Sequence, residues 1–120
     1  MAATYDVQLL EQRRAADIVF SPDESRIYVA MRNGEIHVFD SATRQPLAIW
    51  DVGNALGGLS VSADGSFLLV TERDGAAGHS ILYKVATATG HVDTFQVAGG
   101  ALRDVEIVDS DTAIVSGDSM

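Results

Sequence analysis

The sequence predicts an all-β fold of antiparallel four-stranded units, and three observations support this prediction. Residues 16–30 recur as residues 57–71, and the aspartates of their shared turn, Asp23 and Asp64, lie 41 residues apart. Within each copy, apolar residues alternate with other residues at period two, which is typical of half-buried strands. Tight-turn residues separate these runs at matching positions. A repeat of about 40–45 residues with four short strands is typical of a β-propeller blade.

The first repeat, residues 15–53, predicts one complete blade. Its first turn, residues 21–24, contains a proline that fixes φ and an aspartate that can bond its own backbone. Asn33-Gly34 predicts a tight hairpin because both residues tolerate positive φ. The expected strands include residues 18–20, 27–29, 36–39 and 47–52.

The second repeat, residues 54–99, predicts another blade with the same order of signals. Asp74-Gly75 takes the place of Asn33-Gly34, and the segment 75–80 is an insertion. A third repeat begins in residues 100–120, where Asp104 matches Asp17, but it supplies only two strands. Residues 1–14 are expected to form a strand or a short helix.

These segments are assigned to one partial propeller domain. Propellers usually close with about 4–8 blades, so the predicted fold is an incomplete propeller. The chain is therefore expected to be a fragment of a longer protein. The alternative is a homo-oligomer in which several subunits share one ring.

The repeat resembles a known family. Residues 20–53, FSPDESRIYVAMRNGEIHVFDSATRQPLAIWDVG, are similar to YVTN-type and related WD-like repeats of bacterial β-propellers. Those repeats favour a Ser-Pro-Asp-Gly turn, an Asn-Gly hairpin and a Thr-Gly turn. This chain departs from the pattern at Glu24 and Arg44, whereas Gly65 and Gly90 restore it in the second copy. The resemblance implies the fold and leaves the function open.

Composition excludes several classes of function. The net charge is −9 and the eight cationic residues are scattered, which argues against binding to nucleic acid or to an anionic membrane. The absence of cysteine excludes disulfides, thiolate catalysis and cysteine-ligated metals. No N-terminal signal peptide or membrane-spanning stretch is visible. We expect a soluble protein, either cytoplasmic or exported by a signal that this sequence does not show.

Two aspartates enter the predicted innermost strands. In the propellers that this chain resembles, those strands line a central channel, and the preceding loops lie on its ligand-binding face. Asp17 and Asp104 occupy this position, whereas the second copy has Gly58. A cation such as calcium needs about six to eight oxygen ligands, so two carboxylates fall short. We expect no cofactor, with calcium as the weaker alternative, and we expect these aspartates to accept hydrogen bonds from turns or neighbouring blades.

The hairpin of the second repeat offers further candidates because loops often carry function. Ligand-binding roles are considered for Glu72, Arg73, Asp74 and His79. His79 has no partner histidine at a metal-binding spacing, so no metal site is predicted. No serine lies in a Gly-x-Ser-x-Gly motif, and no catalytic residue is assigned. Asp109 and Asp111 are interpreted as turn residues, and Phe39, Trp50 and Phe95 as core between blades.

The function expected from these patterns is a non-catalytic propeller segment that acts as a binding or scaffold module. Its partner would be a protein or a small molecule on the channel face. Two alternatives remain open at this stage. One is a portion of a propeller enzyme similar to lactonases or other hydrolases, and the other is part of a secreted, calcium-associated bacterial protein.

Overall fold

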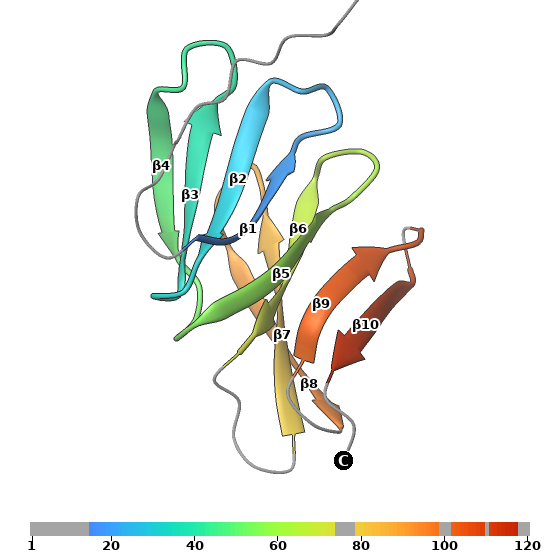
Figure 1. Ribbon diagram of the computed structural model, residues 1–120. Helices are drawn as coiled ribbons and strands as arrows, with labels where there is room; N and C mark the ends of the chain where they lie inside the picture. Colours follow the sequence, from blue (N-terminus) through green and yellow to red (C-terminus); the bar gives the residue numbers. More distant parts are fainter. Residues whose placement is uncertain (1–14, 74–78, 99–101, 110, 118–120) are drawn as a thin grey trace, which may run out of the picture.

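The computed structural model describes residues 15–73, 79–98, 102–109 and 111–117. These residues form three antiparallel sheets, with strand orders β1-β2-β3-β4, β5-β6-β7-β8 and β9-β10 (Figure 1). The strands are β1 (Ala15–Phe20), β2 (Arg26–Met31), β3 (Glu35–Asp40), β4 (Pro46–Asp51), β5 (Leu56–Val61), β6 (Phe67–Glu72), β7 (His79–Ala86), β8 (Val92–Ala98), β9 (Leu102–Ile107) and β10 (Ala113–Gly117). The prediction of an all-β fold with four-stranded antiparallel units is therefore confirmed. Within the described ranges, no helix is long and apolar enough to cross a membrane.

The turn between β1 and β2 is held by one aspartate. Asp23 Oδ1 accepts hydrogen bonds from the Ser21 hydroxyl at 2.7 Å and from the amide and hydroxyl of Ser25 at 3.0 and 2.7 Å. The second repeat builds the same turn around Asp64. These contacts involve only neighbouring residues, which explains why the repeated sequence predicts them.

Two residues outside the repeat consensus adopt the left-handed backbone conformation that favours glycine. Glu24 has φ of 63° and Arg44 has φ of 59°. The matching positions in the second repeat, Gly65 and Gly90, have φ of 76° and 79°. The turns therefore keep their shape in the first repeat, although a side chain is present where glycine would carry less strain.

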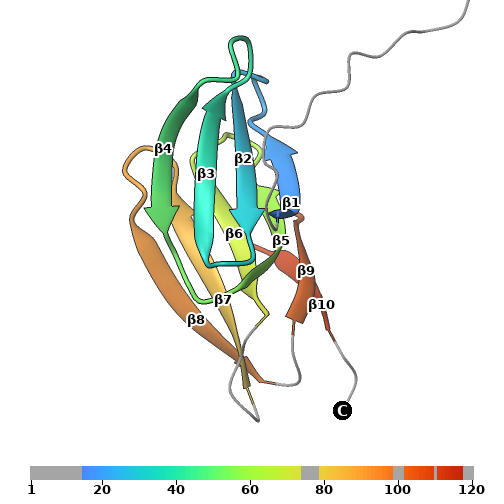
Figure 2. The same ribbon diagram turned by 60° about the vertical axis from the view of Figure 1, so that its left-hand side comes forward.

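The two four-stranded sheets stack face to face, and their main hydrophobic core lies between them (Figure 2). Trp50 of β4 stacks on Tyr28 of β2, with ring centroids 6.2 Å apart. A Cβ atom at Gly90 would lie 2.6 Å from the Trp50 indole. The turn between β7 and β8 therefore packs directly on Trp50, which confirms that this tryptophan belongs to the core between blades.

The opposite face of the first sheet carries a second apolar surface. Because side chains alternate across a strand, Ile27, Val29, Met31 and Phe39 point away from the second sheet and form a separate buried cluster. Large apolar side chains on β1 and β4 lie on the same face but remain exposed; they are Ile18, Phe20, Leu47 and Ile49.

Phe95 differs from the sequence-based expectation. Its side chain was expected in the core between blades, but it is 48% exposed. Among the described residues the third sheet has only two strands, β9 and β10. These strands reach the inner part of the second sheet and leave Phe95, on the outermost strand β8, uncovered.

Candidate functional site

The side chain of Asp17 connects the first sheet to the second through a hydrogen bond from a backbone amide. Its Oδ2 accepts a hydrogen bond from the amide of Leu59 on β5 at 2.9 Å. Its Oδ1 accepts one from the amide of Ile18 at 2.9 Å. Both carboxylate oxygens already have a donor, so this half-buried side chain holds the neighbouring innermost strand in place.

Asp104 lies on β9, and β5 runs between β9 and the strand β1 that carries Asp17 (Figure 1). Its Oδ1 accepts a hydrogen bond from the amide of Val105 at 2.9 Å. This repeats the bond from Ile18 to Asp17 in the first sheet. In the described part of the chain, Asp104 has no counterpart of the Asp17 bond to a following strand.

Gly58, at the equivalent position of the second repeat, permits close contact between β5 and β9. A Cβ atom there would lie 2.2 Å from Asp104 Oδ1 and 2.6 Å from the Asp104 Cα. Thr71 supports this contact, since its hydroxyl accepts from the Gly58 amide at 2.9 Å and donates to the Arg103 carbonyl at 3.4 Å. The second interface between sheets therefore uses close backbone packing where the first uses a carboxylate.

Glu72 is completely buried at the end of β6. Its Oε1 accepts hydrogen bonds from the Asn54 amide at 2.8 Å and from the Tyr83 hydroxyl at 2.6 Å. Its Oε2 accepts one from the Ala55 amide at 2.8 Å. A Cβ atom at Gly53 would lie 2.5 Å from Oε1. The carboxylate thus fixes the segment that connects the first two sheets.

Tyr83 completes this buried group. Burial, together with the Glu72 carboxylate that accepts its hydrogen bond, raises the pKa of Tyr83 well above its usual range. The phenol therefore stays protonated and donates to Glu72. This arrangement suits a structural connection, because the phenol and the carboxylate are both buried and bonded to each other.

The remaining candidates of this hairpin do not form a described cluster with Glu72. Arg73 is exposed, and its amide donates to the Ala55 carbonyl at 2.7 Å. Asp74 lies outside the described residues, and His79 is described only as the first residue of β7. The proposed ligand-binding role of these residues stays a prediction.

The turn aspartates are strongly acidic. Hydrogen bonds from Ser21 and Ser25 lower the pKa of Asp23 to about 2. Those from Ser66 and Ser62 lower the pKa of Asp64 to about 2. In the third repeat, Asp109 Oδ1 accepts from the amide of Asp111 at 2.9 Å, as expected for a turn. Over the described residues, no three His, Cys, Asp or Glu side chains are arranged to hold a metal ion.

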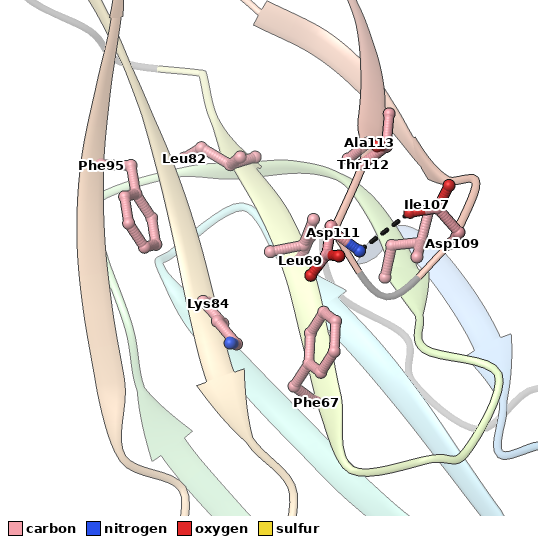
Figure 3. A pocket seen from close by; sticks show the side chains of 10 residues that line it. All are labelled: Phe67, Leu69, Leu82, Lys84, Phe95, Ile107, Asp109, Asp111, Thr112 and Ala113. Atoms are coloured by element: carbon pink, nitrogen blue, oxygen red, sulfur yellow. Dashed lines mark hydrogen bonds between the residues drawn. The ribbon is translucent and has the colours of Figure 1, made fainter.

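An apolar groove of about 240 Å³ lies between the second sheet and the β9–β10 hairpin (Figure 3). Phe67, Leu69 and Leu82 line it from the second sheet, together with Lys84 and Phe95. The Lys84 amine lies 4.6 Å from the centre of the Phe67 ring, a cation–π contact. The facing wall is formed by Ile107, Asp109, Asp111, Thr112 and Ala113.

Comparison with solved structures identifies the fold. The chain is similar to the WD40 repeats of RRP9 (TM-score 0.71, 16% identity), covering 83% of this chain and 31% of that one. It is also similar to hydrazine synthase from Kuenenia stuttgartiensis (0.74, 18%), covering 96% and 32%. A third match is the β-propeller domain of Cps50 (Swd1) from Myceliophteria thermophila (0.66, 15%), covering 81% and 30%.

No protein-family model and no curated protein matches the chain. The solved structures nevertheless define its class: the chain has a β-propeller fold with WD-like blades, and its sheets do not close into a ring. It spans about a third of the length of each of the three matched chains. At these identities the likeness concerns the fold alone.

Sequence reasoning missed the role of Glu72 and Tyr83. It considered Glu72 as a ligand-binding candidate at the hairpin of the second repeat, whereas the structure buries its side chain completely. One signal could have shown this. With a period of 41 residues, Glu72 occupies the position of Met31, which is also buried. A charged residue at a buried position of a repeat needs internal hydrogen-bond donors.

Proposed function

We propose that the chain is a non-catalytic segment of a larger β-propeller and acts as a binding or scaffold module. The observation that carries this proposal is the distribution of exposed apolar side chains. Ile18, Phe20, Leu47 and Ile49 lie on the outer face of the first sheet. At the opposite end, Phe95 is 48% exposed and Ile114 is 64% exposed.

These exposed apolar faces at the two ends favour association with another protein over catalysis. Exposed apolar patches commonly mark protein interaction sites. By contrast, the carboxylates of Asp17 and Glu72 are engaged by backbone amides, and Glu72 also accepts a hydrogen bond from the buried Tyr83 phenol. A protein partner therefore fits the molecule better than a substrate that needs free catalytic groups.

Light scattering of the purified chain over a wide concentration range tests this proposal. We expect the average mass to rise with concentration as end faces associate. Leu47→Glu with Ile49→Glu should block the first end, and Ile114→Glu should block the other. If the contact is head to tail, each variant alone should stay monomeric and their mixture should form a one-to-one pair.

Two results would contradict the proposal. One is a wild-type chain that keeps the mass of a single chain at every concentration and binds no hydrophobic dye. The other is hydrolysis of lactone or ester substrates by the folded chain that disappears on unfolding. Asp93→Asn serves as the control, since this side chain is exposed and, among the described residues, bonds to the ring of His91.

A further inference from the structure

A polar pocket of about 360 Å³ lies between the turns of the first two sheets, and we call it the turn pocket. Its walls are the β1–β2 turn and the β5–β6 turn, which lie side by side (Figure 1). The two turns touch, since a Cβ atom at Gly65 would lie 3.3 Å from Pro22 Cδ. Thr87, at the end of β7, closes the pocket on one side, and its hydroxyl donates to the Gly65 carbonyl at 2.6 Å.

Tyr28 lines the turn pocket with a side chain that is only 4% exposed and that stacks on Trp50. Among the described residues, its hydroxyl has no hydrogen-bond partner. Every side-chain oxygen or nitrogen that the described part of the chain buries completely does have one. The hydroxyl therefore keeps an opening to the outside, and the turn pocket provides it. A buried phenol with no protein partner is left to bond to whatever occupies the pocket.

Asp23 and Asp64 each contribute a carboxylate oxygen that the turns do not use. The three described hydrogen bonds to each side chain all go to Oδ1. In the described part of the chain, no donor bonds to either Oδ2. Both carboxyl groups have a pKa of about 2, so both are ionised at neutral pH. The turn pocket thus offers two charged acceptors and one phenol oxygen.

Arg26 and Tyr28 depart from the repeat, although the aspartates follow it. One period of 41 residues later, their positions hold Phe67 and Leu69. The corresponding pocket between the second and third sheets is smaller, about 190 Å³, and Phe67 and Ile107 are among the residues that line it. The turns therefore form without a polar side chain at either position, and the fold does not require the phenol of the turn pocket.

The charges around the turn pocket favour a positively charged ligand. The exposed Arg26 lies opposite Asp40 in the strand register, and its charge helps to lower the pKa of that carboxyl group. Asp40 thus partly offsets the charge of Arg26, whereas Asp23 and Asp64 remain uncompensated. Over the described residues, no three His, Cys, Asp or Glu side chains are arranged to hold a metal ion. An organic cation with several N–H donors therefore fits better than a metal ion.

We propose that the turn pocket binds an arginine side chain of a protein partner. A guanidinium group presents five N–H donors in a planar fork. It can therefore bond to the unused oxygens of Asp23 and Asp64 and to the phenol oxygen of Tyr28. The turn pocket shares no lining residue with the exposed apolar faces at the two ends, so this binding is independent of the association proposed above.

Titration of the isotope-labelled chain with N-acetyl-argininamide, followed by NMR, tests this proposal. N-acetyl-citrullinamide, which has nearly the same shape but no charge, is the control ligand. Asp64→Asn keeps an oxygen for the turn and places an NH₂ group at the unused position, and Tyr28→Phe removes only the hydroxyl. Asp109→Asn is the matched control variant, because Asp109 holds the turn of the third repeat and does not line the turn pocket.

The arginine ligand should bind at least about tenfold more tightly than the citrulline ligand, because charge-assisted hydrogen bonds are the stronger ones. Asp64→Asn should weaken its binding about fivefold or more, and Tyr28→Phe about threefold. Asp109→Asn should leave the affinity unchanged. Arg26→Gln should strengthen binding about twofold, since a like charge is removed. A loss of folding could not produce this opposite effect.

Equal binding of the two ligands would overturn the proposal. Equal affinities in the wild type, Asp64→Asn and Tyr28→Phe would also overturn it, because the cation would then be attracted only by the acidic surface. Weaker binding after Arg26→Gln would show that the pocket selects a negative group instead. If Asp64→Asn fails to fold, Tyr28→Phe and Arg26→Gln still decide. None of these results bears on the end faces, which the concentration-dependent mass of the chain tests.

Discussion

Glu72→Gln probes the buried group that joins the first two sheets. The substitution keeps the volume but replaces one carboxylate oxygen with an amide NH₂. If the amide oxygen stays in the Oε1 position, it still accepts from Asn54 and Tyr83, while the NH₂ group faces the amide of Ala55. One charge-assisted hydrogen bond is lost, and two donors, the Ala55 amide and the new NH₂ group, face each other.

The expected loss is about 2–3 kcal/mol in the free energy of unfolding, since a buried unsatisfied donor costs about 1–3 kcal/mol and bonds to charged groups contribute about 1.5–3 kcal/mol. Tyr83→Phe removes one donor and leaves the carboxylate with its two backbone bonds, so we expect a smaller loss of about 1 kcal/mol. Glu72→Met restores the residue of the first repeat but removes the acceptor of the three described donors, and should cost about 3–5 kcal/mol.

Urea unfolding followed by Trp50 fluorescence measures these differences, because the single tryptophan lies in the core between the two sheets. Asp93→Asn, which also removes one negative charge but from an exposed position, should leave the midpoint unchanged. The reasoning would be refuted if Glu72→Gln unfolded within about 0.5 kcal/mol of the wild type, the range of ordinary surface substitutions.

Three further predictions follow from the turns and the close strand contact. Asp23 and Asp64 have pKa values of about 2 in the folded chain, below the value of about 3.9 for an unfolded chain. Their ionised forms therefore stabilise the fold above pH 4, and this contribution is lost as the pH falls toward 2. The double variant Asp23→Asn with Asp64→Asn should show a smaller change of the urea midpoint between pH 4 and pH 2 than the wild type. Gly58→Ala should destabilise the chain by about 1–3 kcal/mol in urea unfolding, because the added methyl overlaps Asp104; an unchanged midpoint would show that β9 can move away freely. Glu24→Gly should raise stability by about 0.5–1 kcal/mol by relieving a positive φ, and a lower Tm would contradict this explanation.

Short-range features were predictable because their partners are close in sequence. The turn around Asp23 depends on Ser21 and Ser25, so its serines and aspartate can be read in both copies. The role of Asp17 as a hydrogen-bond acceptor was predictable, but its donors were not. The sequence suggested that it accepts hydrogen bonds from a turn or a neighbouring blade, but only the fold could identify the amide of Leu59, 42 positions away, as a donor.

Glu72 shows why the rest could not be predicted. Its three donors come from a connecting segment and from a strand on the far side of an insertion, so no local pattern unites them. Phe95 shows the complementary limit. Periodicity indicated which face of β8 carries Phe95, but it did not indicate that the described strands β9 and β10 leave this side chain half exposed.

The alternation of Asp17, Gly58 and Asp104 limits how the innermost strands could bind a cation. Both oxygens of Asp17 accept backbone amides, so a cation at this carboxylate would share oxygens that already hold β1 and β5. Gly58 supplies no oxygen from its side chain, and the close contact that it permits brings β9 against β5 in place of a ligand. Two carboxylates and a glycine remain short of the about six to eight oxygens that calcium needs, so the calcium alternative at these aspartates stays a prediction.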